Sequence, residues 1–477
     1  MNASNNSLSV AFHDGTLRVR GLDPKDFAVL RSALPVSWDA RDDCARCDAM
    51  YAAELKDWLR ERGDSFHWEV ERDTDTPLQF SFKASLRPRP DQWEAIDAFE
   101  KNGRRGQIVM PTGTGKTVVA LHLIARCKKS VLIVVPVRDL MYQWHTKIRD
   151  AFGIDAGLIG DGVHRVSPVS VTTYDSAAIH MPRIGNRFHG IVFDEVHHLA
   201  GQWRSDAARM SAATLRLGLT ATPPSQHDRQ SVLKSLVGPI VHRQSITGAA
   251  GKTLADYNVR RIAVSMSESE RRAYRGYGKT IQEFVRNARE AEPEFVWEDI
   301  YKWVAGSRED QERATAALRA LKAFRAKRKI EEQTHGKFRV LEDLFRLHFD
   351  QPVLVFTGSN VMAREVSMRF LVPCLLSHCA KRERQDLLEG FSEGRYPALV
   401  ANRVLDEGVD LPAVKVAIVI GGLSSTRQAT QRLGRVLRRS GDASATLYEV
   451  VTEETNEVRR SRDRRRTSAY RSRGRGS

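Results

Sequence analysis

The sequence contains no run of about 18 consecutive apolar residues, which a membrane-spanning helix would need. Its N-terminus reads MNASNNSLSVAF and lacks the basic residues and apolar core of a secretory signal. Cysteine is scarce, with five residues scattered over 477 positions, which does not fit a disulfide-rich secreted domain. We therefore expect a cytoplasmic, nucleoid-associated protein that is neither secreted nor held in a membrane.

The composition is that of a folded protein with excess positive charge. Hydrophobic residues make up 41% and charged residues 28%, and a chain of this length normally forms two or three domains. Lys and Arg number 75 against 59 Asp and Glu, which gives a net charge of +16. Because such a surface attracts polyanions, nucleic acid is the favoured partner.

Half of this excess lies at the C-terminal end of the chain. Residues 458–477 contain nine Arg and one Asp, with very few apolar side chains. A segment of this composition cannot form a core, so residues 453–477 are expected to be a basic, disordered tail. The tail could simply be solubilising, or it could bind nucleic-acid phosphates non-specifically through counterion release.

Short β-branched runs alternate with helical segments in residues 86–250 and again in residues 351–452. This alternation predicts an α/β fold with two tandem parallel-sheet domains. Residues 251–350 are expected to form a linker and a helical insert, and residues 1–85 a small accessory domain of mixed α and β structure. The expected strands are 107–110, 131–135, 169–172, 190–194, 215–220, 353–356, 372–376, 398–401, 416–420 and 446–450, with 12–19 and 66–70 in the accessory domain.

Two weaker patterns leave alternatives open. Residues 313–329 of the insert carry seven basic residues and no acid, with apolar residues at helical spacing. They fit either a solvated helix docked by its apolar stripe or a basic arm that touches a phosphate backbone. Cys44 and Cys47 form a single C-x-x-C pair with no second pair nearby, so structural zinc is disfavoured there.

The strongest local signal is Met110-Pro-Thr-Gly-Thr-Gly-Lys-Thr117, which follows an expected strand and opens an expected helix. Gly113 and Gly115 would let successive backbone N–H groups turn inward around a phosphate. Lys116 would place its charge near the β- and γ-phosphate oxygens, Thr117 would offer a hydroxyl to Mg²⁺, and the helix dipole would favour the anion. The loop residues expected to bind nucleotide are Pro111, Thr112, Gly113, Thr114, Gly115, Lys116 and Thr117.

A second signal is Ile191-Val-Phe-Asp-Glu-Val-His-His198, in which apolar residues lead to two carboxylates at the end of an expected strand. An α/β sheet binds its ligand at the carboxyl ends of its strands. Asp194 would hold Mg²⁺ through water, because Mg²⁺ dehydrates reluctantly, and Glu195 would orient and deprotonate the attacking water. His197 and His198 lack further ligands at suitable spacing, so a structural or coupling role is favoured over a metal site.

A third signal, Gln431-Arg-Leu-Gly-Arg-Val-Leu-Arg438, lies in the second α/β region. Arg435 and Arg438 are three residues apart and so share one side of a helix. An arginine supplied to the γ-phosphate from a second domain stabilises charge in the transition state. A phosphate loop in one domain and arginines in the other predict a nucleotide cleft whose closure moves the domains, as in a motor.

These motifs and their order resemble superfamily 2 helicases from Leu86 to Val451, and DEVHH with QRLGRVLRR is most similar to the XPB branch of DNA helicases and translocases. The resemblance implies two RecA-like domains, a thumb-like insert, an N-terminal DNA-recognition module, and ATP with Mg²⁺ as cofactors. It also implies roles for further residues: Arg89 and Gln92 contact the base, Arg138, Gln143, Thr173, Thr220 and Thr222 serve nucleic-acid binding or coupling, and Gly408, Asp410 and Gln431 complete the nucleotide site.

The sequence thus predicts an ATP-dependent DNA helicase or double-stranded DNA translocase, monomeric in isolation. Its expected catalytic residues are Lys116, Asp194, Glu195, Arg435 and Arg438. An ATP-dependent RNA helicase is the alternative, because the 2′-hydroxyl contacts that select the strand are not readable here. A non-catalytic recruitment protein on a helicase scaffold is less favoured, since every residue that the chemistry needs is present.

Overall fold

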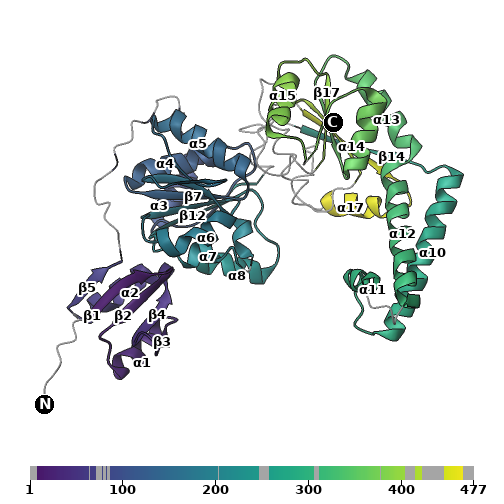
Figure 1. Ribbon diagram of the computed structural model, residues 1–477. Helices are drawn as coiled ribbons and strands as arrows, with labels where there is room; N and C mark the ends of the chain where they lie inside the picture. The colour runs from purple at the N-terminus through teal and green to yellow at the C-terminus, as the bar shows by residue number, and fades with distance from the viewer. Residues whose placement is uncertain are drawn as a thin grey trace, which may run out of the picture. The chain divides into compact units, whose positions relative to one another are not determined.

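The computed structural model describes residues 8–63, 65–70, 78, 82, 86–201, 203–245, 257–305, 311–376, 378–402, 414–421 and 445–465. The chain divides near residue 250 into two compact units, which are described separately. Each unit contains one large sheet with helices on its faces (Figure 1). Within the described residues, no helix is both long and apolar enough to cross a bilayer.

The first unit begins with a small α+β layer whose sheet has the strand order β3-β4-β2-β1-β5. β1 (Leu8–His13) and β2 (Thr16–Arg20) form a hairpin that turns at Asp14 and Gly15, both of which have positive φ. The single strand expected at 12–19 is therefore the turn and parts of two strands. The remaining elements are β3 (Ser37–Asp39), β4 (Cys44–Asp48), β5 (Phe66–Glu69), α1 (Pro24–Ala33) and α2 (Ala52–Glu61).

The small layer packs against the rest of the first unit. Met50, in the turn after β4, is buried in the same apolar cluster as the helices of the larger sheet. Glu54 of α2 forms an ion pair with Arg105, the first residue of β6 (Arg105–Val109), and Asn186 donates a hydrogen bond to the carbonyl oxygen of Val70. The N-terminal layer is therefore held by apolar, ionic and hydrogen-bonded contacts.

The larger sheet of the first unit has the order β13-β6-β12-β11-β7-β10-β8-β9 and is parallel except for the β8–β9 hairpin. Central strands such as β7, with the sequence VLIVV, are fully buried because helices cover both faces. The strands are β6 (Arg105–Val109), β7 (Val131–Val135), β8 (Gly157–Gly160), β9 (Val163–Arg165), β10 (Val169–Thr173), β11 (Gly190–Asp194), β12 (Leu215–Thr220) and β13 (Ile240–Arg243).

Helices from two parts of the chain cover the two faces of this sheet. α3, α4 and α5 contribute to the apolar core on one face, and α6, α7 and α8 contribute to the core on the other (Figure 1). Their bounds are α3 (Pro90–Lys101), α4 (Lys116–Cys127), α5 (Arg138–Phe152), α6 (Tyr174–Ile184), α7 (Asp206–Arg209) and α8 (His227–Leu236). The α/β fold class predicted from the strand–helix alternation is confirmed.

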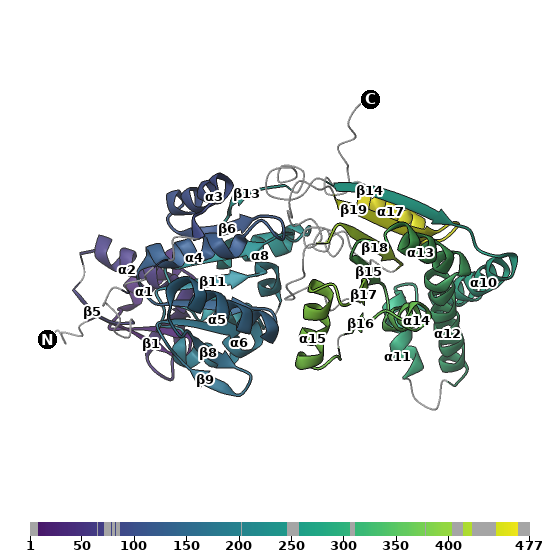
Figure 2. The same cartoon turned by 90° about the horizontal axis from the view of Figure 1, so that it is seen from above.

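The second unit contains an all-parallel sheet with the order β14-β19-β18-β15-β17-β16. Its strands are β14 (Tyr257–Val264), β15 (Val353–Thr357), β16 (Cys374–Leu375), β17 (Ala398–Ala401), β18 (Val416–Ile420) and β19 (Ala445–Thr452). Helices α13 (His335–Leu347), α14 (Asn360–Phe370) and α15 (Lys381–Ser392) accompany it (Figure 2). The core combines these strands with α13 and α14.

Two elements differ from the expected insert at 251–350. β14 is an edge strand of the second sheet and pairs with β19 over eight residue pairs. α13 buries Phe338, Leu341 and Leu344 in the core of that sheet. The insert proper is therefore shorter than expected, and it consists of α10 (Glu268–Ala291), α11 (Ile300–Val304) and α12 (Gln311–Gln333).

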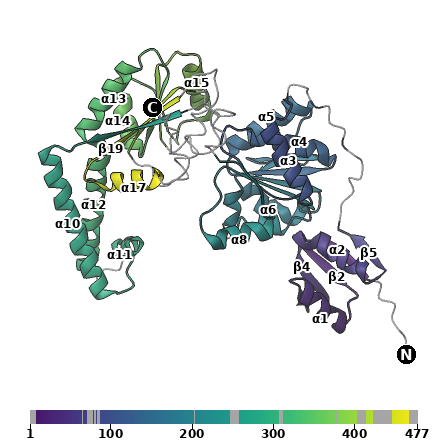
Figure 3. The same ribbon diagram turned by 180° about the vertical axis from the view of Figure 1, so that it is seen from behind.

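The insert is a pair of long helices, α10 and α12, that run side by side with α11 near one end (Figures 1 and 3). Phe284, Phe295 and Leu321 belong to an apolar cluster that joins the three helices. Leu321 of the apolar stripe is therefore docked and Phe324 packs on Trp297, but Leu318 is 40% exposed, so the docked-helix alternative is met only in part. Lys322 and Arg325 of α12 are exposed, so the basic side chains remain available to an anion.

We expected residues 453–477 to be disordered throughout, but part of this segment is helical. Residues Asn456–Arg465 form helix α17, which packs on β19. The composition argument was wrong for this segment because buried polar contacts, and not apolar side chains, hold the helix. Glu457 pairs with Lys337 at 2.6 Å, Arg460 pairs with Glu331 at 2.6 Å, and Ser461 donates to Glu449.

Candidate active site

Three neighbouring strands bring the first two sequence motifs to one edge of the first sheet. In the order β6-β12-β11, Val109 pairs with Thr220, and Leu219 pairs with Asp194. Because the three strands are parallel, their carboxyl ends meet at the same edge. The phosphate loop, which follows Val109, therefore begins beside the carboxylates of the second motif.

The loop after β6 has the backbone shape of an anion cradle. Gly113 and Gly115 have φ values of 85° and 87°, which side-chain-bearing residues rarely adopt. Helix α4 starts at Lys116, whose Nζ donates to the carbonyl oxygens of Met110 at 3.1 Å and Pro111 at 3.5 Å. The N-terminus of α4 thus points its positive dipole end at the loop.

Two polar side chains of the loop strengthen this shape. Thr114 is fully buried, and its Oγ1 donates to the carbonyl oxygen of Pro111 at 2.7 Å. The Oγ1 atom of Thr112 is buried without a hydrogen-bond partner among the described residues. An unsatisfied hydroxyl costs free energy unless a ligand or water meets it, so the loop has donor capacity to spare. These features fit a bound phosphate chain.

Arg89 and Gln92 support the loop from the start of α3. Gln92 is 1% exposed, its Nε2 donates to the carbonyl oxygen of Thr114 at 2.9 Å, and its Oε1 accepts from the backbone N–H of Arg89 at 3.0 Å. The Arg89 guanidinium donates to the same Thr114 oxygen. A Cβ atom at Gly115 would displace Gln92 Nε2, and the φ of 87° disfavours any side chain at this position. In this structure both residues contact the loop.

Asp194 is held by neutral hydrogen-bond donors. It ends β11, is 8% exposed, and accepts from Trp144 Nε1 at 2.8 Å and from the backbone N–H of Glu195 at 3.0 Å. Its backbone carbonyl oxygen accepts from the hydroxyl of Tyr174 at 3.0 Å. These contacts fix the carboxylate without cancelling its charge, which suits a group that faces a cation through water.

Glu195 lies next to the end of β12. Its backbone has a φ of 47°, an uncommon left-handed conformation that turns the chain sharply after the strand. Thr220 Oγ1 donates to Glu195 Oε2 at 3.4 Å, and His197 Nδ1 lies 3.4 Å from the same oxygen. His197 Nδ1 is also 3.2 Å from Thr220 Oγ1. The three side chains form one cluster that orients the Glu195 carboxylate.

Thr222 joins this cluster through the backbone, because its N–H donates to Thr220 Oγ1 at 3.2 Å. The same threonine hydroxyl therefore contacts a carboxylate, an imidazole and the loop after β12. Such an arrangement can transmit a change at Glu195 to that loop. The coupling roles of Thr220 and Thr222 remain predictions that this geometry supports.

The residues expected to contact nucleic acid lie at the starts of two helices. Arg138 opens α5, has a side chain 70% exposed, and pairs with Asp161 at 2.6 Å. Gln143 is on the second turn of α5 and is half-buried. Thr173 is the N-cap of α6, where its Oγ1 accepts from the N–H of Ser176 at 3.2 Å. Their expected contacts with nucleic acid remain predictions.

Sequence reasoning missed Trp144 and Tyr174, although each directly follows a residue that was expected to contact nucleic acid, Gln143 and Thr173. Their indole and phenol groups are buried and bond to Asp194, which is 50 and 20 residues away in the sequence, so the sequence alone does not reveal these hydrogen bonds. The remaining predicted site residues lie outside the described residues: Gly408, Asp410, Gln431, Arg435 and Arg438.

Within the described ranges, no three His, Cys, Asp or Glu side chains gather to form a protein-only metal site. Cys44 and Cys47 are buried residues of β4, and three positions apart on a strand they face opposite sides. Mg²⁺ needs no such cluster, because it binds through one or two protein oxygens, water and phosphate. Thr117 and Asp194 fit that donor set.

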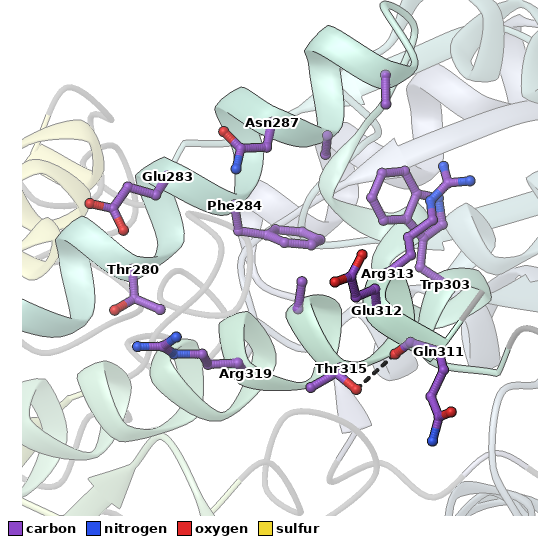
Figure 4. A pocket seen from close by; sticks show the side chains of 13 residues that line it. Thr280, Glu283, Phe284, Asn287, Trp303, Gln311, Glu312, Arg313, Thr315 and Arg319 are labelled. Carbon is purple, nitrogen blue, oxygen red and sulfur yellow. Dashed lines mark hydrogen bonds between the residues drawn. The ribbon is translucent and has the colours of Figure 1, made fainter.

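A cavity of about 870 Å³ lies between α10 and α12 of the insert (Figure 4). Phe284 and Trp303 line it, together with Arg313, whose guanidinium stacks 3.4 Å from the centre of the Trp303 ring. The cavity contains none of the predicted nucleotide-binding residues. It is a feature of the second unit and is separate from the site on the first sheet.

The chain matches two families by sequence. Residues 85–225 match the Type III restriction enzyme res subunit family, and residues 336–440 match the helicase conserved C-terminal domain. Solved structures share the fold at low identity. The Hef helicase domain of Pyrococcus furiosus has a TM-score of 0.56 at 17% identity, covering 78% of this chain and 98% of that one. Saccharomyces cerevisiae Dbp5 has a TM-score of 0.54 at 15% identity, covering 82% and 92%.

Curated relatives are more similar. The chain is 38% identical to the "DNA 3'-5' translocase XPB2" of Sulfurisphaera tokodaii over 83% of its length and 89% of that protein. It is 29% identical to the putative helicase Rad25 of Halobacterium salinarum and 28% identical to the helicase XPB of Kineococcus radiotolerans. The aligned part spans 62% and 60% of these two longer proteins. The chain therefore belongs to the XPB family of superfamily 2 helicases and translocases.

Proposed function

We propose that this protein is an ATP-dependent DNA translocase or helicase, which couples ATP hydrolysis to movement along DNA. One observation carries the proposal: the phosphate loop after β6 lies at the same sheet edge as Asp194 and Glu195, in a chain of the XPB family. A donor-rich loop beside two carboxylates is the arrangement that phosphoryl transfer to water needs.

Each site residue of the first unit would have its own role in ATP hydrolysis. The backbone of residues 111–117 would wrap the triphosphate, and Lys116 would move its ammonium from the loop carbonyls to phosphate oxygens. Bound Mg²⁺ would neutralise charge on those oxygens, with Thr117 and Asp194 as its protein donors. Glu195, oriented by Thr220 and His197, would accept the proton of the attacking water.

The second unit completes the proposal through residues outside the described ranges. Gln431, Arg435 and Arg438 would reach the γ-phosphate from the second RecA-like domain, and Gly408 with Asp410 would lie near nucleotide and strand. Hydrolysis would then change how strongly the two domains attract each other, which is how a two-domain motor takes a step. In this proposal, residues 86–250 form the first RecA-like domain and residues 351–452 form the second.

DNA is favoured over RNA because the curated relatives are named for DNA. The small N-terminal layer would then be an accessory DNA-recognition module and the insert a thumb-like contact, with the protein acting as a monomer on the nucleoid. The net charge of +16 supports a polyanionic track of either kind.

The test is ATP turnover by the purified chain without nucleic acid and with matched single-stranded DNA, duplex DNA, forked DNA, single-stranded RNA and duplex RNA. We expect DNA to stimulate turnover by at least tenfold and RNA to do so several-fold less. Stronger stimulation by RNA would favour the RNA helicase alternative. No turnover under any condition, in a chain that still binds DNA, would favour a recruitment protein on a helicase scaffold.

A further inference from the structure

Two helices of the first unit converge on Asp194 from the regions expected to touch nucleic acid. α5 opens with Arg138 and, six residues later, donates from Trp144 Nε1 to Asp194 Oδ2 at 2.8 Å. α6 opens with Tyr174, directly after Thr173, and donates from the Tyr174 hydroxyl to the carbonyl oxygen of Asp194 at 3.0 Å. The two donors belong to different helices yet hold the same residue.

These bonds are buried and specific. Trp144 is 1% exposed and Tyr174 is fully buried, so water cannot replace either donor. An indole has one N–H and no acceptor, so Trp144 has a single possible use for its polar atom. A hydrogen bond to a charged acceptor is stronger than one between neutral groups, which makes the Trp144 contact the stronger of the two.

The distances along the helices are short enough for rigid transmission. Trp144 is six residues from Arg138, which corresponds to about 9 Å along the axis of α5. Tyr174 is adjacent to Thr173, the N-cap of α6. A packed helix moves as one body, so a small displacement at its start also moves the donor further along.

We propose that Trp144 and Tyr174 are positioning residues that link nucleic-acid contact at the starts of α5 and α6 to the orientation of Asp194. A shift of either helix on binding DNA re-aims the carboxylate that serves the metal, while Glu195 follows because its N–H is bonded to Asp194 Oδ1. The inference rests on the proposed function, since it needs nucleic acid at one end and nucleotide at the other.

Two substitutions remove the bonds, and two matched substitutions leave them in place. Trp144→Phe deletes the indole N–H, and Tyr174→Phe deletes one hydroxyl with almost no change of shape. Tyr51→Phe is the control for the second, because it deletes a phenol hydroxyl beside the same apolar cluster that contains Tyr174. Ile148→Val is the control for the first, because it loosens the same helix in the same core without touching Asp194.

The first readout is binding, and it needs no catalysis. The affinity of a fluorescent, non-hydrolysable ATP analogue with Mg²⁺ is measured with and without saturating duplex DNA, and the ratio of the two affinities is the coupling factor. The second readout is the ratio of ATP turnover with and without DNA. We compare whichever of the two ratios is larger in the wild-type chain. This ratio should be roughly tenfold smaller in Trp144→Phe and about threefold smaller in Tyr174→Phe. Both controls should keep it within twofold.

The possible failures are distinguishable. A wild-type chain with neither ratio above one contradicts the proposed function itself. A wild-type chain with a clear ratio that both variants retain within twofold overturns the coupling role alone. Basal and DNA-stimulated turnover that fall in equal proportion assign the two residues a purely structural role, which also overturns it. If Trp144→Phe does not fold, Tyr174→Phe decides, because it removes one atom only.

Discussion

Buried carboxylates are held in opposite ways in the two units. In the first unit, the described contacts of Asp194 come from an indole N–H and a backbone N–H, both neutral. In the second unit, Glu457 is paired with the fully buried ammonium of Lys337, and Glu331 is paired with Arg460. Neutral donors orient a carboxylate and leave its charge for a cation, whereas an ion pair cancels the charge and leaves none for a ligand.

Asp194 is thus available to a cation, whereas the paired carboxylates of Glu331 and Glu457 stabilise the fold. The ion-paired cluster joins α10, α12, α13, β19 and α17, because Tyr274 of α10 donates to Glu331 at 2.7 Å and Thr452 of β19 donates to the Glu331 carbonyl oxygen at 2.8 Å. Burial, reinforced by this bond to Glu331, raises the pKa of Tyr274, so the phenol remains a donor at neutral pH. The root of the insert is thereby fixed to the second sheet.

The largest effect on activity is expected from Glu195→Gln. The amide keeps the shape of the side chain but cannot accept a proton, so ATP turnover should fall by about 10³-fold. The melting temperature should stay within about 1 °C of the wild-type value, because Glu195 contributes no ion pair to the fold that the amide could not replace with a hydrogen bond. Coupled-enzyme ATPase assays and thermal melts measure the two quantities.

DNA binding is the internal control for this variant. A Glu195→Gln chain that hydrolyses ATP at the wild-type rate would remove Glu195 from the chemistry. One that loses turnover together with DNA binding and thermal stability would show that the carboxylate belongs to the architecture, and the contrast between the two units would fail.

The largest effect on stability is expected from Lys337→Met, at the other side of the comparison. The substitution leaves Glu457 buried and unpaired, which typically costs about 3–5 kcal/mol in the free energy of unfolding. Denaturant unfolding, followed by mass-spectrometric hydrogen exchange of the backbone amides in α13 and β19, reports on the second unit. Adding Glu457→Gln to Lys337→Met should recover a large part of the loss, because it removes the unpaired charge.

Arg346→Met is the matched control, since it breaks an ion pair on the same helix, α13. Arg346 and Glu342 are both exposed, so this pair should contribute less than about 1 kcal/mol. Equal losses for Lys337→Met and Arg346→Met would show that burial does not decide the strength of these pairs, and the cluster would lose its structural role.

The sequence predicted what depends on neighbouring residues and missed what depends on distant ones. β11 is an apolar run that ends at Asp194, and β6 ends in the apolar pair Ile108 and Val109 just before the loop, so the phosphate loop and Asp194 could be placed at strand ends. β14, with the sequence YNVRRIAV, is an edge strand with polar positions and reads poorly as a buried run. Pairing with β19, some 190 residues later, makes it a strand.

Helix α17 and the hydrogen bond between Trp144 and Asp194 were missed for the same reason. α17 has a mean composition typical of disorder, and the contacts that fold it come from Glu331 and Lys337, more than 100 residues earlier in the chain. Trp144 is 50 residues from Asp194, and an indole on an apolar helix face reads as core. Only the fold brings these partners together, so no local pattern could have revealed them.

The smallest effect on activity, and a third case for the comparison, concerns Cys47. Burial raises the pKa of this thiol to about 12, and the nearby carboxylates of Asp48 and Glu54 add to the shift. With the pKa raised from its usual value of 9.0, the native thiol stays protonated at pH 8, and its thiolate fraction falls by roughly 10³-fold. Alkylation by iodoacetamide, mapped by mass spectrometry, should therefore be slow in native protein and fast in urea.

The same shift sets the sign of a pH effect on stability. Between about pH 9 and pH 12 the unfolded chain loses the Cys47 proton while the folded chain keeps it, so the contribution of Cys47 to stability falls as the pH rises through this window. Cys47→Ala should weaken that dependence and leave ATP turnover unchanged. Fast alkylation of the native protein at pH 8 would show that the Cys47 thiol is not held in its neutral form. Zinc that copurifies with the chain and is lost in Cys47→Ala would show that this thiol binds a metal. Either result would contradict the prediction.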